Sequence, residues 1–179
     1  MSVKKLVQCF AVTGFLAVSA ISAQAQNKQI RDGFWFSGGL GYGSLGCDNC
    51  GSRTSGVSGG LSLGGTITPR FLLGVGTEGW TKSEQGATLT VATLDARVRF
   101  YPVTTGGFFL TGGVGVGSVS GAASGFSATE TGVGMVFGLG YDYRVARNAS
   151  ITPYWNGFAM KNSNTDANVG QLGLAVTLH

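Results

Sequence analysis

The chain has 179 residues, of which only 11% are charged and 43% are hydrophobic, and 32 of them are glycines. An ordinary globular domain has about 25% charged residues, so this chain lacks the charged exterior of a soluble fold. Its formal net charge of +4 includes no basic run interleaved with aromatic residues, which gives no support for nucleic-acid binding.

The first 25 residues have the pattern of a secretory signal peptide. Paired lysines are followed by the apolar residues 10–21, and Ala23-Gln24-Ala25 forms a small-residue cleavage site. The apolar segment is shorter than the roughly 20 residues that a spanning helix needs, which argues against a membrane anchor. We therefore predict that residues 1–25 are a cleaved signal peptide and that residues 26–179 form one domain.

From Gly33 to the C-terminus, large apolar residues alternate with glycine, serine and threonine in eight segments. Side chains of a strand point to opposite faces in turn, so each segment predicts a strand with one apolar and one small-residue face. This pattern suits a barrel whose apolar face meets lipid. We predict an all-β fold, an eight-stranded antiparallel up-and-down transmembrane β-barrel. The expected strands are residues 33–44, 56–67, 71–81, 88–101, 108–119, 131–144, 150–158 and 169–179.

The connections between these strands alternate in length along the chain. Short turns are expected at 68–69, 102–107 and 146–149, and longer loops at 45–55, 82–87, 120–130 and 159–168. Short turns face the periplasm in bacterial barrels, so we expect both termini there. Outward-facing aromatic residues, typical of a membrane interface, gather at the short-turn end. They are Phe34, Phe36, Phe71, Phe100, Phe108, Tyr141 and Tyr143.

Several charged residues fall on the inward faces of the expected strands. Eight strands enclose a lumen that side chains fill, and unpaired buried charge is very costly. Three acids and three arginines are therefore predicted to form a network that plugs the lumen. Glu78 is expected to lie higher than the others and apart from them. The six residues are Glu78, Asp95, Arg97, Arg99, Asp142 and Arg144.

Pro153 falls inside the expected seventh strand. Proline has no backbone N–H, so one hydrogen bond of the ladder should be missing there. We expect a β-bulge at this position.

The whole pattern resembles the small OmpA/OmpX-type barrels of the outer membrane protein β-barrel domain family. The C-terminal segment is similar to the signal read by the barrel-assembly machinery, with Gln171, Gly173, Val176 and Leu178 at its key positions. Many family members end on an aromatic residue, where this chain has His179. The resemblance implies a bacterial outer-membrane location, with membrane lipid, the assembly machinery and periplasmic chaperones as partners. We expect a monomer.

The first loop contains the motif Cys47-Asp48-Asn49-Cys50. In an oxidising compartment this spacing favours a disulfide between Cys47 and Cys50. A metal site would need further ligands, and no second C-x-x-C or nearby histidine is present. A redox-active pair normally opens a helix, which the predicted sheet lacks. We predict a structural disulfide, no bound metal and no cofactor.

His179 is the single histidine of the chain. As a catalytic base it would need a serine and an orienting acid nearby. It is expected at the periplasmic end and solvated, whereas barrel lipid A deacylases and surface proteases work near the outer leaflet. We therefore predict a non-enzymatic barrel that acts in envelope integrity or in adhesion, with an extracellular ligand bound through its loops. Two alternatives remain: a lipid-modifying enzyme on the same scaffold, and a narrow pore.

Overall fold

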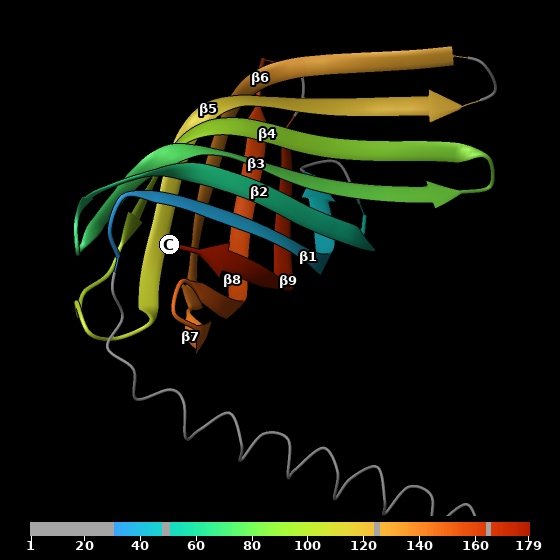
Figure 1. Cartoon of the computed structure of the whole chain (residues 1–179). Helices are drawn as coiled ribbons and strands as arrows, with labels where there is room; N and C mark the ends of the chain where they lie inside the picture. The colour runs from blue at the N-terminus through green and yellow to red at the C-terminus, as the bar shows by residue number, and fades with distance from the viewer. Residues whose placement is uncertain (1–30, 48–50, 124–125, 164–165) are drawn as a thin grey trace, which may run out of the picture.

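The computed structural model describes residues 31–47, 51–123, 126–163 and 166–179, so the predicted signal peptide lies outside the described residues. All neighbouring strands pair antiparallel, and pairing of β6 with β8 closes the sheet into a barrel (Figure 1). The strands are β1 (Phe34–Cys47), β2 (Thr54–Thr68), β3 (Phe71–Glu84), β4 (Ala87–Phe100), β5 (Phe108–Ala123), β6 (Phe126–Tyr141), β7 (Tyr143–Ala146), β8 (Ala149–Lys161) and β9 (Asp166–Leu178).

Strands β6 and β7 are two parts of one barrel strand. Only Asp142 separates them, and β8 pairs with both. Gly140 of β6 faces Tyr154, and Tyr143 of β7 faces Ile151. The described residues therefore form a closed barrel of eight antiparallel strands, which confirms the predicted fold class.

The bulge expected at Pro153 is wrong. Pro153 pairs in register with Leu174 of β9. The irregularity in the β7–β8 ladder lies nearer the turn between these strands, between Arg144 and Ala146. Because proline has no N–H to donate, the ladder is instead interrupted where β6 gives way to β7. The backbone N–H of Asp142 donates to the carbonyl of Gly107, 2.9 Å away.

The hairpin of β3 and β4 is longer than predicted. The two strands stay paired to Glu84 and Ala87, so most of the loop expected at 82–87 is strand. Gln85 and Gly86 connect them with φ angles of 50° and 81°. Positive φ at both central residues is what a type I′ turn requires, and this turn matches the twist of paired strands.

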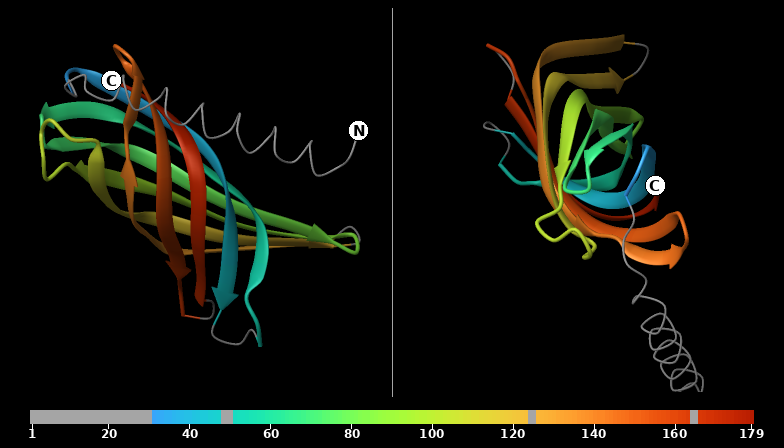
Figure 2. Two further views of the ribbon diagram at one scale, coloured as in Figure 1. Left: turned by 90° about the horizontal axis from the view of Figure 1, so that it is seen from below. Right: turned by 60° about the vertical axis from the view of Figure 1, so that its left-hand side comes forward.

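The hairpin of β5 and β6 is also longer than predicted. Its strands pair out to Ala123 and Phe126, within the loop expected at 120–130. Pairing of β6 with β8 begins only at Val133, so β6 runs on beyond its neighbour. Both hairpins therefore project as one four-stranded sheet beyond the rest of the barrel (Figures 1 and 2).

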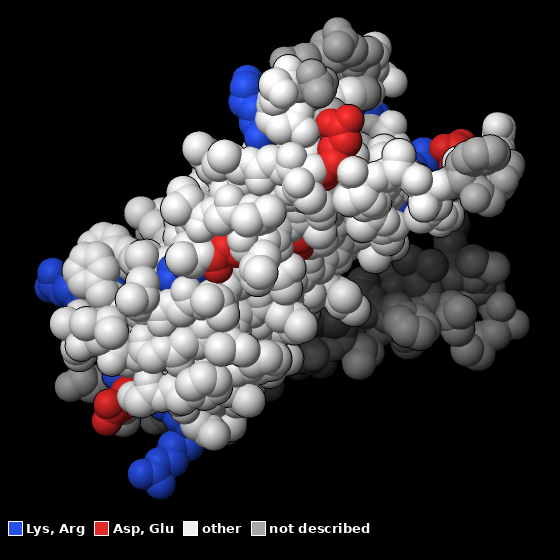
Figure 3. Space-filling view, turned by 90° about the horizontal axis from the view of Figure 1, so that it is seen from above, with Lys and Arg blue, Asp and Glu red and all other residues white. Residues whose placement is uncertain are grey.

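The outer face of the barrel is apolar. Leu40 is 75% exposed and Leu94 63%, and the terminal β9 row of leucines and valine is 40–67% exposed. Most of the surface visible in Figure 3 is uncharged, and most of the lysines and arginines in view lie toward the ends of the molecule. The structure contains no helix long and apolar enough to span a membrane in its described segments.

The interior is layered along the barrel. One apolar cluster, which includes Trp80, Val91 and Phe158, fills the half nearer the projecting hairpins. A second, of Trp35, Leu72, Tyr101 and Phe109, lies toward the short turns. Between the two clusters, the inward positions of β3 and β4 carry charge.

Candidate functional site

The charged layer of the lumen begins on β3 and β4. On this pair of strands Asp95 faces Gly76 and Arg97 faces Gly74. A Cβ atom on Gly76 would collide with the Arg97 guanidinium. Glycine at this inward position therefore gives a long charged side chain room to lie across the sheet.

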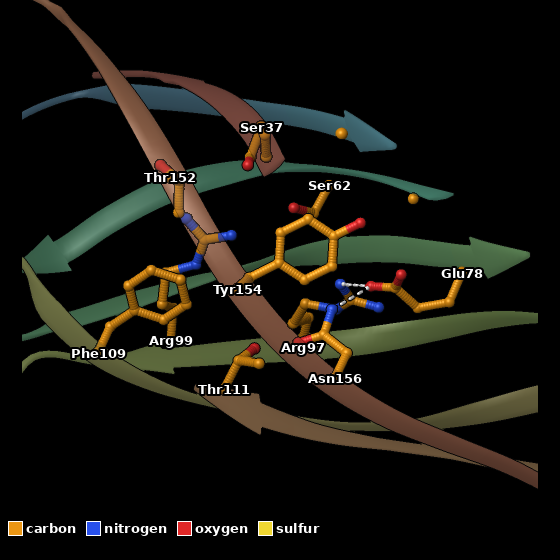
Figure 4. Close-up of a pocket in the computed structure, with 13 residues that line it drawn as sticks. Ser37, Ser62, Glu78, Arg97, Arg99, Phe109, Thr111, Thr152, Tyr154 and Asn156 are labelled. Atoms are coloured by element: carbon orange, nitrogen blue, oxygen red, sulfur yellow. Dashed lines mark hydrogen bonds and ion pairs between the residues drawn. The ribbon is translucent and has the colours of Figure 1, made fainter. Parts of the chain in front are cut away.

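Arg97 holds two carboxylates at once. Its Nη1 donates to Glu78 at 2.6 Å (Figure 4). Its Nε and Nη2 donate to Asp95 at 2.8 and 2.7 Å. All three side chains are at most 3% exposed. A bidentate pair of this kind is among the stronger hydrogen-bonded contacts, and its attraction opposes the cost of desolvating the ions.

Glu78 is linked to the opposite wall of the barrel. Asn156 of β8 donates to its Oε1 at 3.0 Å, and Gln171 of β9 donates to its Oε2 at 2.6 Å. The expectation that Glu78 lies apart is therefore wrong. Gln171, selected as part of the assembly signal, is buried and hydrogen-bonded inside the lumen.

A second polar cluster surrounds Asp142, where β6 gives way to β7. Tyr101 and Thr152 each donate a hydroxyl hydrogen bond of 2.7 Å to its carboxylate. Thr152 also lies 2.9 Å from Thr177, which in turn contacts Ser37 of β1. The break in the strand thus places a buried carboxylate among hydroxyl groups from several strands.

His179 joins this second cluster and is not solvated. Its side chain is 4% exposed, and Nε2 lies 3.4 Å from Asp142 Oδ2. The alternation of β9 explains the error, because the outward row ends at Leu178. The next residue is on the inward parity. His179 is therefore an additional inward residue that follows the outward row of β9.

Arg99 is held by aromatic rings. Its guanidinium carbon lies 4.7 Å from the Trp35 ring and 4.3 Å from the Phe109 ring. Such cation–π contacts are worth about 2 kcal/mol when desolvated. Nε and Nη1 of Arg99 are buried and have no hydrogen-bond partner among the described residues.

Arg31 is a charged interior residue that the sequence analysis missed. It precedes β1, so strand alternation gives no signal for it. Its guanidinium donates to the carbonyls of Thr104, at 3.1 Å, and Gly106, at 2.5 Å, and it stacks on Tyr101. Desolvation lowers the pKa of Arg31, against the opposing effects of Tyr101 and Asp142.

Arg144, by contrast, is not among the buried charged residues of the described chain. Its guanidinium donates to the carbonyls of Ala146 and Arg147 in the adjacent turn, where it is partly exposed. The buried charged residues of the described chain are still three acids and three arginines, with Arg31 where Arg144 was expected. They are Arg31, Glu78, Asp95, Arg97, Arg99 and Asp142.

The remaining predicted site residues lie on the wall and rim. Cys47 is disulfide-bonded, and Cys50 lies outside the described residues. Val176 and Leu178 face outward, and a Cβ atom on Gly173 would collide with the Tyr154 ring. No group of His, Cys, Asp and Glu side chains in the described part of the chain is placed to hold a metal ion.

A small internal cavity of about 30 Å³ lies within the charged layer. Glu78 and Arg97 line one part of it and Arg99 another, with the Tyr154 ring between them (Figure 4). A buried water needs about 10–15 Å³, so the cavity is too small for a channel and has room for about two waters.

A closed eight-stranded barrel with an apolar outer face and a filled interior defines a small transmembrane β-barrel protein. The chain belongs to the outer membrane protein beta-barrel domain family, which matches residues 13–179. Membership of this family implies the bacterial outer membrane as its location.

Solved structures with the same fold are distant in sequence. Neisserial surface protein A is 14% identical, with a TM-score of 0.68, and the match covers 84% of this chain and 99% of that one. The attachment invasion locus protein Ail of Yersinia pestis is 11% identical, with a TM-score of 0.56, covering 83% and 100%. The N-terminal barrel domain of Pseudomonas aeruginosa OprF is 14% identical, with a TM-score of 0.51, covering 83% and 100%. No curated protein sequence matches this chain.

Proposed function

We propose that this protein is a non-enzymatic outer-membrane barrel that presents the β3–β6 sheet at the cell surface for adhesion. The observation that carries the proposal is the projection of these paired strands beyond the rest of the barrel (Figure 2). Paired strands present a preformed surface, so little conformational entropy is lost when a partner binds.

The charges near the projecting end favour a protein partner over a polyanion. Lys82 pairs with Glu84 at 2.7 Å, and Lys161 pairs with Asp166 at 2.9 Å. Cations and carboxylates of the described residues are equal in number at this end, whereas a polyanion needs an excess of positive charge. They are Arg53, Lys82, Lys161, Glu84, Glu130 and Asp166. Ail has been solved with the heparin analogue sucrose octasulfate, so a sulfated glycan is the competitor to test.

An open pore is disfavoured by what fills the lumen. A conducting path would have to pass the Glu78–Arg97–Asp95 cluster and the apolar layer around Trp80 and Phe158. Both layers draw on strands from different sides of the barrel, which supports a structural plug.

A lipid-modifying enzyme is disfavoured by the surroundings of His179. Its imidazole is buried beside Asp142 and Tyr101, toward the short turns. A catalytic histidine has to reach a substrate, but the side chain of His179 is buried inside the barrel.

We further propose that both termini face the periplasm, that residues 1–25 are removed on export, and that Cys47 pairs with Cys50. Its partners during and after assembly would be membrane lipid, periplasmic chaperones and the barrel-assembly machinery. Its functional state would be a monomer. The short turns at the end of the barrel where the termini lie support this orientation, because the periplasmic turns of bacterial barrels are short.

Adhesion is tested with intact cells on immobilised host matrix and serum proteins. Cells that carry the protein should bind, and cells without it should not. Replacing residues 83–88 by a two-residue Asn-Gly turn should reduce binding, whereas Asn-Gly in place of Arg147-Asn148 at the opposite end should not. Equal binding with and without the protein would contradict adhesion, and increased detergent sensitivity without it would then favour the envelope role. Loss of binding in soluble heparin would favour a sulfated glycan.

A further inference from the structure

The lumen contains a guanidinium group, that of Arg99, with N–H donors that have no acceptor in the described part of the chain and a charge that is not balanced locally. Arg99 is 5% exposed, and its Nε and Nη1 have no hydrogen-bond partner among the described residues. A buried donor left unsatisfied costs about 1–3 kcal/mol, and more when it is charged. Arg99 also lines the internal cavity.

The charges around Arg99 are locally unbalanced, although the interior as a whole is neutral. Arg31, Arg99 and Asp142 interact electrostatically, so two guanidinium groups share one carboxylate. That carboxylate also accepts hydrogen bonds from Tyr101 and Thr152. The excess negative charge lies in the other cluster, where Glu78 and Asp95 share Arg97.

We propose that the Arg99 end of the cavity binds one small monovalent anion of halide size. Trp35 and Phe109 approach the guanidinium, and guanidinium groups bind anions through the N–H groups on their edges. Nε and Nη1 lie on different edges of the group, so one ion would contact at most one of them. The ion would balance the second guanidinium of this cluster. It would lie on the Arg99 side of the Tyr154 ring, away from the Glu78 carboxylate (Figure 4).

The size of the cavity selects the anion. A volume of about 30 Å³ accommodates a halide and at most one water, because one water needs about 10–15 Å³. Sulfate and phosphate, with four oxygens each, need more space, and we expect them to bind less well. The site therefore differs from the surface adhesion proposed above and stands whether or not that function is correct.

The first test is urea unfolding of the full mature protein folded in detergent, in sodium bromide, chloride, sulfate or gluconate at constant ionic strength. Above the dissociation constant, the folded-to-unfolded ratio should rise about tenfold for each tenfold increase in bromide or chloride. Sulfate and gluconate should give no such rise. Arg99→Met should abolish the halide dependence, and Arg144→Met, which changes an arginine of the adjacent turn, should retain it.

The second test remains available if Arg99→Met does not fold. Crystals of the unsubstituted protein grown in bromide should give an anomalous peak in contact with the Arg99 guanidinium. Equal stability in all four salts, an unchanged halide dependence in Arg99→Met, or water alone at this position would overturn the proposal.

Discussion

The guanidinium carbon of Arg31 lies 3.5 Å from the centre of the Tyr101 ring. The same tyrosine donates its hydroxyl to Asp142, so one aromatic ring joins the segment before β1 to the break between β6 and β7. Arg31 also donates to two carbonyls of the turn that follows β4. The N-terminal segment is therefore fastened into the short-turn end of the barrel.

This contact gives the first prediction. Arg31→Ala should lower the free energy of unfolding by about 2 kcal/mol, the scale of a desolvated cation–π contact. Urea unfolding in detergent measures the change. Asp32→Ala, which alters the exposed neighbouring residue, is the control and should be near neutral. Equal effects of the two substitutions would show that Arg31 is solvated.

The second prediction concerns the buried ion cluster. Arg97→Ala leaves Glu78 and Asp95 without their cation and should cost about 3–5 kcal/mol. Lys161→Ala removes an exposed pair and should cost at most about 1 kcal/mol. Unfolding midpoints of the two variants in urea provide the comparison. A silent Arg97→Ala would mean that the lumen is well hydrated.

The third prediction addresses the hydroxyl group of Tyr101. Tyr101→Phe keeps the ring that contacts Arg31 but removes a 2.7 Å hydrogen bond to Asp142. A hydrogen bond to a charged group is worth about 1.5–3 kcal/mol, and the unfolding free energy should fall by that amount. Tyr141→Phe changes an outward-facing tyrosine and serves as the matched control. The hypothesis fails if both variants unfold at the same urea concentration.

The fourth prediction uses the close approach of neighbouring strands. A Cβ atom at Gly115 would collide with the backbone carbonyl of Leu94, whereas one at Gly121 meets nothing within 4 Å. Gly115→Ala should therefore slow folding or lower stability, and Gly121→Ala should not. Heat-modifiable migration on gels reports the folded fraction of each variant. Normal folding of Gly115→Ala would show that the strands separate easily.

The fifth prediction tests which way the barrel faces. In a background of Cys47→Ser and Cys50→Ser, a cysteine at Glu84 should react with an impermeant reagent on whole cells. A cysteine at Thr105, in the turn after β4, should react only after lysis, because that turn is proposed to face the periplasm. The opposite result would invert the topology.

Strand alternation alone predicted most of the fold. The period of two separates the lipid-facing row of β9 from its inward row, and it placed Asp95, Arg97 and Arg99 on the inner face of β4. This information is local, because the alternating pattern is recognised from residues that are close together in the chain. Closure into eight strands followed from the number of such segments.

The partners of the interior residues were decided only by the tertiary structure. Alternation does not give the height at which Glu78 meets Arg97, because that depends on the tilt and register of β3 against β4. Strand alternation also gives no prediction for Arg31, which lies before the first strand and stacks on Tyr101. It does not predict that the Arg144 guanidinium bonds to the carbonyl of Ala146 in its own turn. The sequence determined which faces are apolar and which are charged. Closure of the barrel decided which charges meet, because it removes the inward side chains from water, where each charged group needs a partner within reach.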